Sequence, residues 1–206
     1  MSADPWIAAL DEDAGDLGSP RPLVWWGTVL GLMSVGMAMA TFLFAYFYLG
    51  IVQGDRWPPD DVSAPPVLLP LVVTVLLLAA GVTATLASRA ARGQSLLAAQ
   101  GACLATALLG AGACAAHLIA LGQWGVDPTA HAHGSVVTIG LVVHLVVTAT
   151  GVLAHAVLTV NVGDEPVRRF QAIIALGLLW WFVLLTWVLT AGTMFYGHVV
   201  LPGGSP

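Results

Sequence analysis

Gly134 to Gly151, with the sequence GSVVTIGLVVHLVVTATG, is the stretch that decides the fold. Extended to Val162, this stretch contains no charged residue and no proline. A helix needs ~20 predominantly apolar residues, at ~1.5 Å each, to cross a bilayer. The segment is therefore long enough to span a membrane, and His144 lies near its middle. Because an ionisable group at such depth is costly, its presence predicts a specific role.

The composition of the whole chain agrees with this segment. Hydrophobic residues make up 58% of the 206 residues and charged residues only 8%, against ~25% charged residues in ordinary soluble domains. A soluble chain of this length buries only ~70% of the surface that it exposes when unfolded. The composition therefore predicts an integral membrane protein.

Five segments have the length and polarity of membrane spans, and none of them contains an acidic residue or an arginine. The predicted spans cover residues 23–52, 67–88, 96–122, 134–162 and 170–196. We predict an all-α, polytopic bundle of five transmembrane helices in residues 23–198. Residues 1–22 hold five acidic residues and one arginine, which predicts a disordered acidic tail, and residues 199–206 form a short C-terminal tail.

The arginines predict the orientation in the membrane. With five spans, five of the six arginines fall on one side of the bilayer, and there is no lysine: Arg21, Arg89, Arg92, Arg168 and Arg169 share that side, and Arg56 lies on the other. Short loops rich in arginine stay cytoplasmic. We therefore expect the N-terminus inside and the C-terminus outside.

Small residues at helical spacing predict close approach between helices. These positions are Gly31, Ser34 and Ala38 in the first span and Gly101, Gly110 and Gly112 in the third. The two cysteines, Cys103 and Cys114, would lie ~16 Å apart along one helix, which is too far for a disulfide.

The histidines are the candidates for chemistry. His117 and His144 are expected at similar depth on neighbouring helices, where they could hold a haem or a metal between neutral imidazoles. His155 lies on nearly the same face as His144 but nearer the cytoplasm. The alternative is that each buried imidazole only hydrogen-bonds a neighbouring helix. His131 and His133 form a His-x-His pattern that could bind a metal in the outer loop, or could simply be loop residues.

Other functional classes find little support. A carrier or proton pump usually has acidic residues or arginines within its spans, and this chain has none there. A phosphate loop, a dinucleotide fingerprint, a nucleophile elbow and a CxxC pair are also absent from the sequence. We therefore expect a membrane subunit without an active site of its own, which binds a larger partner and no nucleic acid.

The order of several short motifs resembles subunit III of the haem-copper terminal oxidases (the cytochrome c oxidase subunit 3 family), in its short, five-helix bacterial form. The motifs are Trp26-Gly27 followed by Ser34, the aromatic run from Ala45 to Leu49, Trp57-Pro58-Pro59, Gly134-Ser135 followed by His144 and Gly151, and Trp180, Phe182 and Val183 followed by Trp187. They extend from about Trp25 to Tyr196. The chain departs from the family pattern where ionisable or amide residues are usual, at Val35, His117, Ala120, Val147, Trp181 and Leu184.

This resemblance implies an accessory subunit of a respiratory-chain complex in the bacterial inner membrane. Such a subunit packs beside subunit I, in a complex that also contains subunit II. It binds phospholipid and supports sustained turnover, while haem and copper belong to the partner subunits. The complex passes electrons from cytochrome c or quinol to oxygen and pumps protons. Three alternatives stay open: a haem-binding membrane cytochrome that uses His117 and His144, a subunit III-like component of a nitric oxide reductase assembly, and a small transporter or lipid-binding protein that acts alone.

Overall fold

The computed structural model describes residues 23–60, 62, 67–93, 95–160 and 166–196. The predicted tails at 1–22 and 199–206 lie outside the described residues. Five long helices and one 3-10 helix make up the fold, and no strand occurs in the described ranges. Their bounds are α2 Leu23–Gln53, η1 Gly54–Arg56, α3 Leu68–Arg92, α4 Leu96–Trp124, α5 Ala132–Val160 and α6 Pro166–Tyr196.

All five long helices are long and apolar enough to cross a membrane, which confirms the prediction of an all-helical fold with five helices of this kind. Several helix ends differ from the predicted spans. α3 continues past Ser88 to Arg92, and α6 starts at Pro166 rather than at Phe170. A helix can continue beyond the hydrocarbon core because arginine side chains reach the headgroup region. α5 begins two residues before Gly134, and the last two residues of its predicted span, 161–162, lie outside the described residues.

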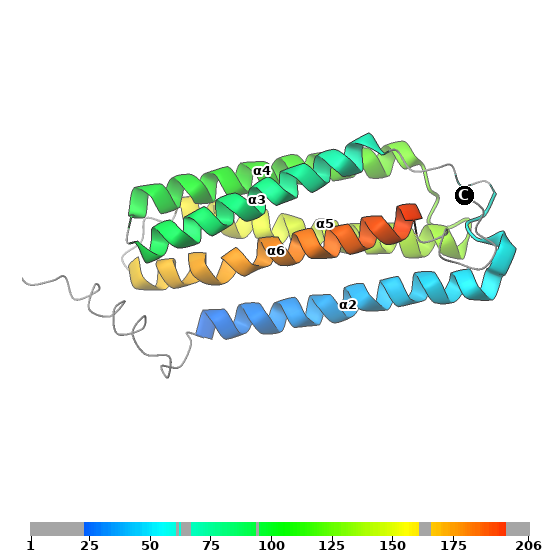
Figure 1. The fold of residues 1–206 in the computed structure, drawn as a ribbon, viewed down its shortest axis with the longest axis horizontal. Helices are drawn as coiled ribbons and strands as arrows, with labels where there is room; N and C mark the ends of the chain where they lie inside the picture. Colours follow the sequence, from blue (N-terminus) through cyan, green and yellow to red (C-terminus); the bar gives the residue numbers. More distant parts are fainter. Residues whose placement is uncertain (1–22, 61, 63–66, 94, 161–165, 197–206) are drawn as a thin grey trace, which may run out of the picture.

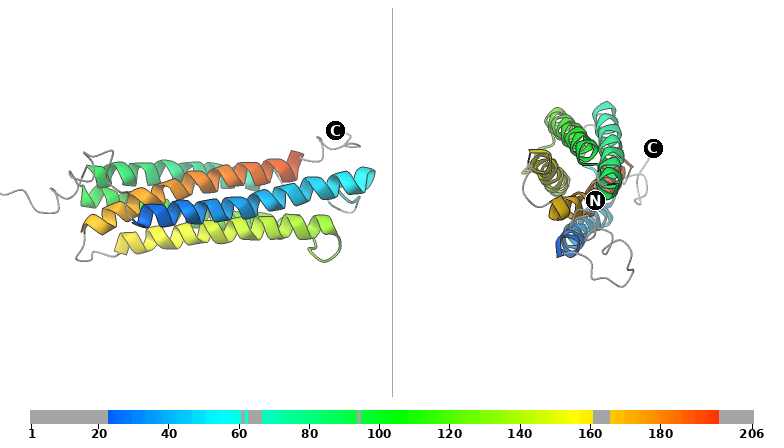
Figure 2. Two further views of the ribbon diagram at one scale, coloured as in Figure 1. Left: turned by 90° about the horizontal axis from the view of Figure 1, so that it is seen from below. Right: turned by 90° about the vertical axis from the view of Figure 1, so that its left-hand side faces the viewer.

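The helices run alternately in opposite directions along an elongated bundle (Figure 1). α3 packs against α4 and α6, and α5 packs against the same two helices, so these four form the body of the bundle. α2 lies along α6 and α5, and the two views of Figure 2 show it on the outside of the other four. Arg89, Arg92 and Arg169 therefore lie at one end of the bundle and Arg56 at the other.

Small side chains allow α3 and α4 to pack closely. The buried face of α3 presents a run of alanines, and that of α4 presents alanines, Cys103, Thr106 and Gly110. Thr106 Oγ1 lies 2.9 Å from Thr83 Oγ1 and joins the two helices. On α4, Gly110 leaves room for the Trp180 ring of α6, because a side chain at this position would collide with that ring. Both cysteines are free, as predicted.

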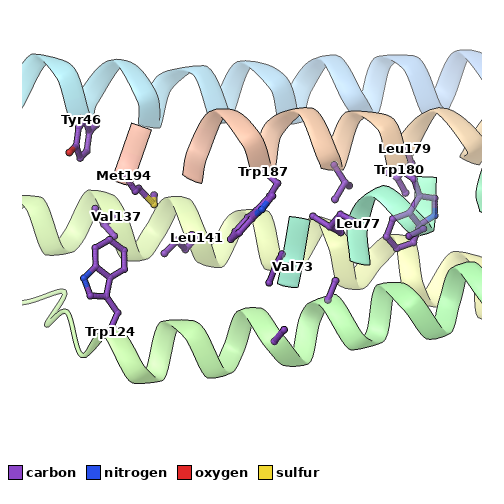
Figure 3. Packing of buried hydrophobic residues seen from close by; sticks show 14 of the residues in the cluster. Tyr46, Val73, Leu77, Trp124, Val137, Leu141, Leu179, Trp180, Trp187 and Met194 are labelled. Carbon is purple, nitrogen blue, oxygen red and sulfur yellow. The ribbon is translucent and has the colours of Figure 1, made fainter. Parts of the chain in front are cut away.

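The interior of the bundle is filled by large side chains from all five helices. Figure 3 shows Tyr46 from α2, Val73 and Leu77 from α3, Trp124 from α4, Val137 and Leu141 from α5, and Leu179, Trp180, Trp187 and Met194 from α6. Two of the buried tryptophans, Trp180 and Trp187, lie two helical turns apart on α6, and both point into the bundle. α6 therefore packs against α2, α3 and α5, and its two large indoles reach into the interior of the bundle.

Two of the small-residue patterns that predicted close contact between helices, one on α4 and one on α2, do not make all of those contacts within the described residues. On α4, a side chain added at Gly101 would meet no atom within 4 Å, whereas one at Gly110 would collide and one at Gly112 would make only ordinary contact. On α2, Gly31 and Ala38 are exposed, and so is Ser34. The reason is that α2 turns a different face inward, on which Met39, Tyr46 and Gly50 are buried.

Arg169 ties the end of α5 to the start of α6. Its Nη2 donates a hydrogen bond to the carbonyl of Leu158, and its side chain is buried. Leu158 lies in the last turn of α5, where backbone carbonyls have no partner within the helix. The positive guanidinium is also favoured there by the negative end of the helix dipole. Arg169 therefore serves as a cap for α5 that is donated by the neighbouring helix.

Arg169→Met is expected to lower the free energy of unfolding by about 1.5–3 kcal/mol, the usual contribution of a hydrogen bond to a charged group. Methionine keeps much of the apolar stem but cannot donate to Leu158. Unfolding in mixed detergent micelles, followed by circular dichroism, measures the change. Arg92→Met is the matched control, because Arg92 is exposed at the same end of the bundle. Equal losses in the two variants would contradict the capping role.

Candidate functional site

Two histidines and a tryptophan from three helices meet in the middle of the bundle. The ring centres of His117 on α4 and His144 on α5 lie 5.6 Å apart. The indole of Trp187 on α6 lies 4.8 Å from His117 and 5.3 Å from His144. His117 and Trp187 are 2% exposed and His144 is 1% exposed. The structure thus brings together the two imidazoles that the sequence placed at similar depth; we call these three residues the imidazole–indole cluster.

Hydrogen bonds to neighbouring helices fix two members of this cluster. Trp187 Nε1 donates to Thr74 Oγ1 on α3 over 2.8 Å, and that hydroxyl donates to the Pro70 carbonyl. His144 Nε2 lies 3.0 Å from the carbonyl of Val183 on α6. Because a carbonyl only accepts hydrogen bonds, the proton of neutral His144 is on Nε2. The remaining nitrogen, Nδ1, is buried and has no hydrogen-bond partner among the described residues, and the same is true of His117 Nε2.

The space beside the cluster is small. A cavity of about 20 Å³ is bordered by His117 and Trp187 together with Pro70, Leu141 and Met194. A single water needs ~10–15 Å³ of such space. The cavity is therefore no larger than a water molecule needs and does not fit a porphyrin, and Trp187 packs against both imidazoles. The residues do not fit a haem in this packing.

His155 belongs to a second, separate contact. Trp180 Nε1 lies 3.2 Å from His155 Nδ1, and both side chains are fully buried. An indole N–H only donates, so Nδ1 accepts in this contact, whereas its 3.1 Å contact with the Gly151 carbonyl requires Nδ1 to carry the proton. The two contacts need different tautomers of His155, so Nδ1 makes one of these hydrogen bonds at a time. His155 follows His144 by eleven residues on α5, or ~16 Å of helix, and so it lies outside the imidazole–indole cluster.

His131 and His133, the predicted loop pair, have ring centres 5.8 Å apart. His131 Nδ1 accepts the backbone N–H of Gly134 over 2.8 Å, in the first turn of α5. His133 is buried against Trp57, at 4.8 Å between ring centres, and against Tyr46, at 5.8 Å. These contacts give His131 a capping role at the start of α5 and make His133 part of the core at this end of the bundle.

The loop before α5 is closed by side-chain hydrogen bonds. Asp127 Oδ1 accepts from the backbone N–H and from the hydroxyl of Thr129, both over 2.7 Å. These two bonds, the backbone one first, lower the pKa of Asp127 below its ordinary value. The Asp127 carbonyl touches Gly134, where any side chain would collide with it, and Ser135 Oγ donates to the Pro128 carbonyl over 2.6 Å. Gly134 and Ser135 therefore allow this loop to pack against the first turn of α5.

Among the other residues of the subunit III-like motifs, some are buried in the bundle and others are exposed. Gly151 packs against Leu179 and Trp180. Trp57, which precedes Pro58 through a cis peptide bond, is buried. By contrast, Trp26 is 50% exposed and Gly27 has no neighbour within 4 Å. Ser34 is also exposed, and its hydroxyl donates to the Leu30 carbonyl of its own helix. The first motif thus faces away from the bundle, whereas Trp57, Gly151 and the tryptophans Trp180 and Trp187 of the later motifs lie in its interior.

Positions that depart from the family pattern also lie in different settings. His117 and Ala120 are buried, Val35, Val147 and Leu184 are half-buried, and Trp181 is 44% exposed. The five long helices described contain no aspartate, glutamate or lysine, and their arginines lie near the helix ends. Their other ionisable side chains are imidazoles, phenols and thiols.

The sequence did not reveal how Trp187 and Thr74 contribute to the cluster. A signal was present, because a buried indole N–H needs an acceptor and Thr74 is one of four hydroxyl-bearing residues of α3. Comparison with protein-family models and with curated proteins finds no match to this chain. The likeness to subunit III therefore rests on the order and spacing of its sequence motifs.

Proposed function

We propose that this chain is an accessory, non-catalytic subunit of a haem-copper respiratory oxidase complex in the bacterial inner membrane. It packs beside subunit I through the exposed face of α2, near subunit II, binds phospholipid and supports sustained electron transfer from cytochrome c or quinol to oxygen. The N-terminus is on the cytoplasmic side in this proposal. The observation that carries it is a stripe of small residues on the outer face of α2.

This stripe consists of five small residues that recur every three or four positions, none of them buried: Gly27, Gly31, Ser34, Ala38 and Thr41. A side chain added at Gly27 or Gly31 would meet no atom within 4 Å. The hydroxyls of Ser34 and Thr41 donate to carbonyls of their own helix, so the surface presents no unpaired hydroxyl proton. The stripe is therefore smooth, apolar and unused by the rest of the described chain.

Lipid contact gives no reason for such a stripe. Glycine costs a helix ~1 kcal/mol relative to alanine, and acyl chains pack well against larger side chains. A second helix does benefit, because small residues allow two backbones to approach closely and gain van der Waals contact. The outer face of α2 thus supports a protein partner, and the resemblance to subunit III supplies its identity as subunit I.

Replacing Gly27 and Gly31 together by leucine is expected to detach the chain from its partner. The wild-type chain, purified in mild detergent, should retain a large polytopic partner that contains haem and copper, and the double variant should lose at least about nine-tenths of it. Leucine is a good helix former, so the fold of α2 is kept. Gly101→Leu is the matched control, since Gly101 is exposed on α4 and has no neighbour within 4 Å.

Other outcomes separate the alternatives. A wild-type chain that purifies alone as a monodisperse protein would contradict the accessory role. A Soret band in the isolated chain that disappears in His144→Ala would favour the cytochrome alternative. Complexes from cells that lack this chain should keep their redox centres but lose activity during turnover; full and lasting activity would contradict the support role.

A further inference from the structure

The cap at the start of α5 is an imidazole, and this makes it sensitive to protonation. His131 precedes Ala132, the first residue of α5, and its Nδ1 accepts the N–H of Gly134, the third residue, over 2.8 Å. The usual residues at this position are Ser, Thr, Asn and Asp, which accept through oxygen and keep doing so near neutral pH. An imidazole nitrogen accepts only while it carries no proton. Histidine is also the side chain whose charge ordinarily changes between ~pH 5 and 8.

A proton on His131 Nδ1 removes the cap and adds an unfavourable charge. Protonated Nδ1 is a donor, and it can no longer accept from the Gly134 N–H. The imidazolium also faces the N-terminus of α5, which is the positive end of the helix dipole. The uncapped state therefore binds one proton more than the capped state, so its population rises as the pH falls. The cap is present near neutral pH and is lost in acid.

Asp127 offers the charged imidazole another partner. The Asp127 carbonyl and the His131 ring both flank Gly134, and a side chain at Gly134 would collide with that carbonyl and lie 3.2 Å from His131 Cε1. The pKa of Asp127 is lowered first by its hydrogen bonds with Thr129, and in smaller part by the charge of nearby His131. Asp127 is exposed on the loop that ends at His131. A carboxylate is therefore close to the imidazole on the aqueous side.

The other ionisable groups at this end of the bundle face different neighbours. The ring centre of His133 lies 5.8 Å from that of His131, but His133 is buried against Trp57 and Tyr46. His131 itself is only half-buried. Around it, the described residues place Asp127 on its own loop, His133 on α5, Tyr46 on α2, and Asp55, Arg56 and Asp60 on the segment that follows α2. His131 is thus the imidazole of this end that water reaches more readily.

We propose that His131 is a pH-sensitive cap, which releases the first turn of α5 when the outer side of the membrane becomes acidic. In the capped state, neutral His131 holds Gly134, and Ser135 Oγ holds the Pro128 carbonyl. In acid, the imidazolium turns to the Asp127 carboxylate and the first turn frays. Because His133 in this turn packs against Trp57, fraying loosens the contact of α5 with the segment after α2. The cap belongs to this chain alone, whereas its exposure to acid rests on the proposed function, in which the complex pumps protons outward.

The test is hydrogen–deuterium exchange at the Gly134 and Ser135 amides of the purified full-length chain, corrected for the intrinsic pH dependence of exchange. Protection at Gly134 should fall about fivefold from about pH 7.5 to about pH 5.5, as expected for loss of one cap. His131→Asn keeps a good cap that binds no proton, so its protection should stay high at both pH values. His131→Ala should be poorly protected at both. Amides in the middle of α5, such as that of Leu141, are the internal reference and should not change.

Asp127→Asn tests the exchange of partners separately. Asparagine keeps an oxygen for Thr129 but carries no charge, so release of the cap should need a lower pH than in the wild type. The proposal is overturned if wild-type protection does not depend on pH, if His131→Asn keeps the wild-type pH dependence, or if His131→Ala is as protected as the wild type at about pH 7.5. An unchanged midpoint in Asp127→Asn would overturn the role of Asp127. All of these measurements use the isolated chain, so their outcome is independent of whether the oxidase partner is found.

Discussion

Gly110→Ala is expected to lower the free energy of unfolding by about 2–3 kcal/mol, the usual cost of overpacking a dense core. A side chain at this position of α4 would collide with the Trp180 indole and come within 2.8 Å of Val152 Cγ2. Trp180 cannot move aside cheaply, because it is fully buried and its N–H is directed at His155. The added methyl group therefore has to push α4 away from α6.

Gly101→Ala on the same helix provides the control, with an effect of opposite sign. Nothing lies within 4 Å of a side chain at Gly101, so alanine there should raise stability by up to ~1 kcal/mol through its better helix propensity. Unfolding by a denaturing detergent at increasing concentration, followed by circular dichroism, measures both variants under one set of conditions. If Gly110→Ala were as stable as Gly101→Ala, the close approach of α4 and α6 at Trp180 would be wrong.

The number and approximate extent of the helices could be predicted from the sequence because the bilayer imposes one strong condition. Each span must satisfy its own backbone hydrogen bonds over the hydrocarbon thickness, so a long apolar run without charges predicts a helix. The predicted span 96–122, for instance, became α4, Leu96–Trp124. The ends were less certain, as at Arg92 and Pro166, because polar helix ends continue into the interface.

The direction in which each helix faces could not be predicted with the same success. In a soluble protein, polar residues mark the outer face, but here lipid and core are both apolar and no polar stripe distinguishes them. Gly101 and Gly110 are alike in sequence, yet one faces outward and the other meets Trp180. The small residues around Gly31 likewise predicted a close contact with a second helix, and none of the described residues makes that contact at Gly31.

The positions of the histidines could likewise be predicted only in part. Their depth follows from helical rise, so His117 and His144 could be placed near each other from the sequence. The packing of Trp187 against both imidazoles could not be predicted, because the rotation of α6 about its axis decides whether Trp187 or Trp181 faces inward. The separation of His155 from the pair did follow from the sequence, since eleven residues of helix keep the two apart.

Trp187→Ala is expected to lower the free energy of unfolding by about 3 kcal/mol, near the lower end of the range for deleting a buried aromatic ring. The lower end applies because the bilayer gives no hydrophobic gain for burial, and the loss is mainly of van der Waals contact. The ring joins α6 to three other helices, through His117 on α4, His144 on α5 and the hydrogen bond to Thr74 on α3. Its removal therefore leaves a cavity where four helices meet.

Trp181→Ala is the matched control for this prediction. Its indole also donates to a threonine of α3, Thr85, over 3.0 Å, but the side chain is 44% exposed. Because both tryptophans make such a hydrogen bond, the difference between the variants measures the contribution of packing around the imidazole–indole cluster. We expect Trp181→Ala to cost about 1 kcal/mol, the usual net contribution of one hydrogen bond. Trp187→Phe should fall between the two, since phenylalanine keeps most of the packing and loses the bond to Thr74. Equal costs for Trp187→Ala and Trp181→Ala would show that the cluster does not hold the four helices together.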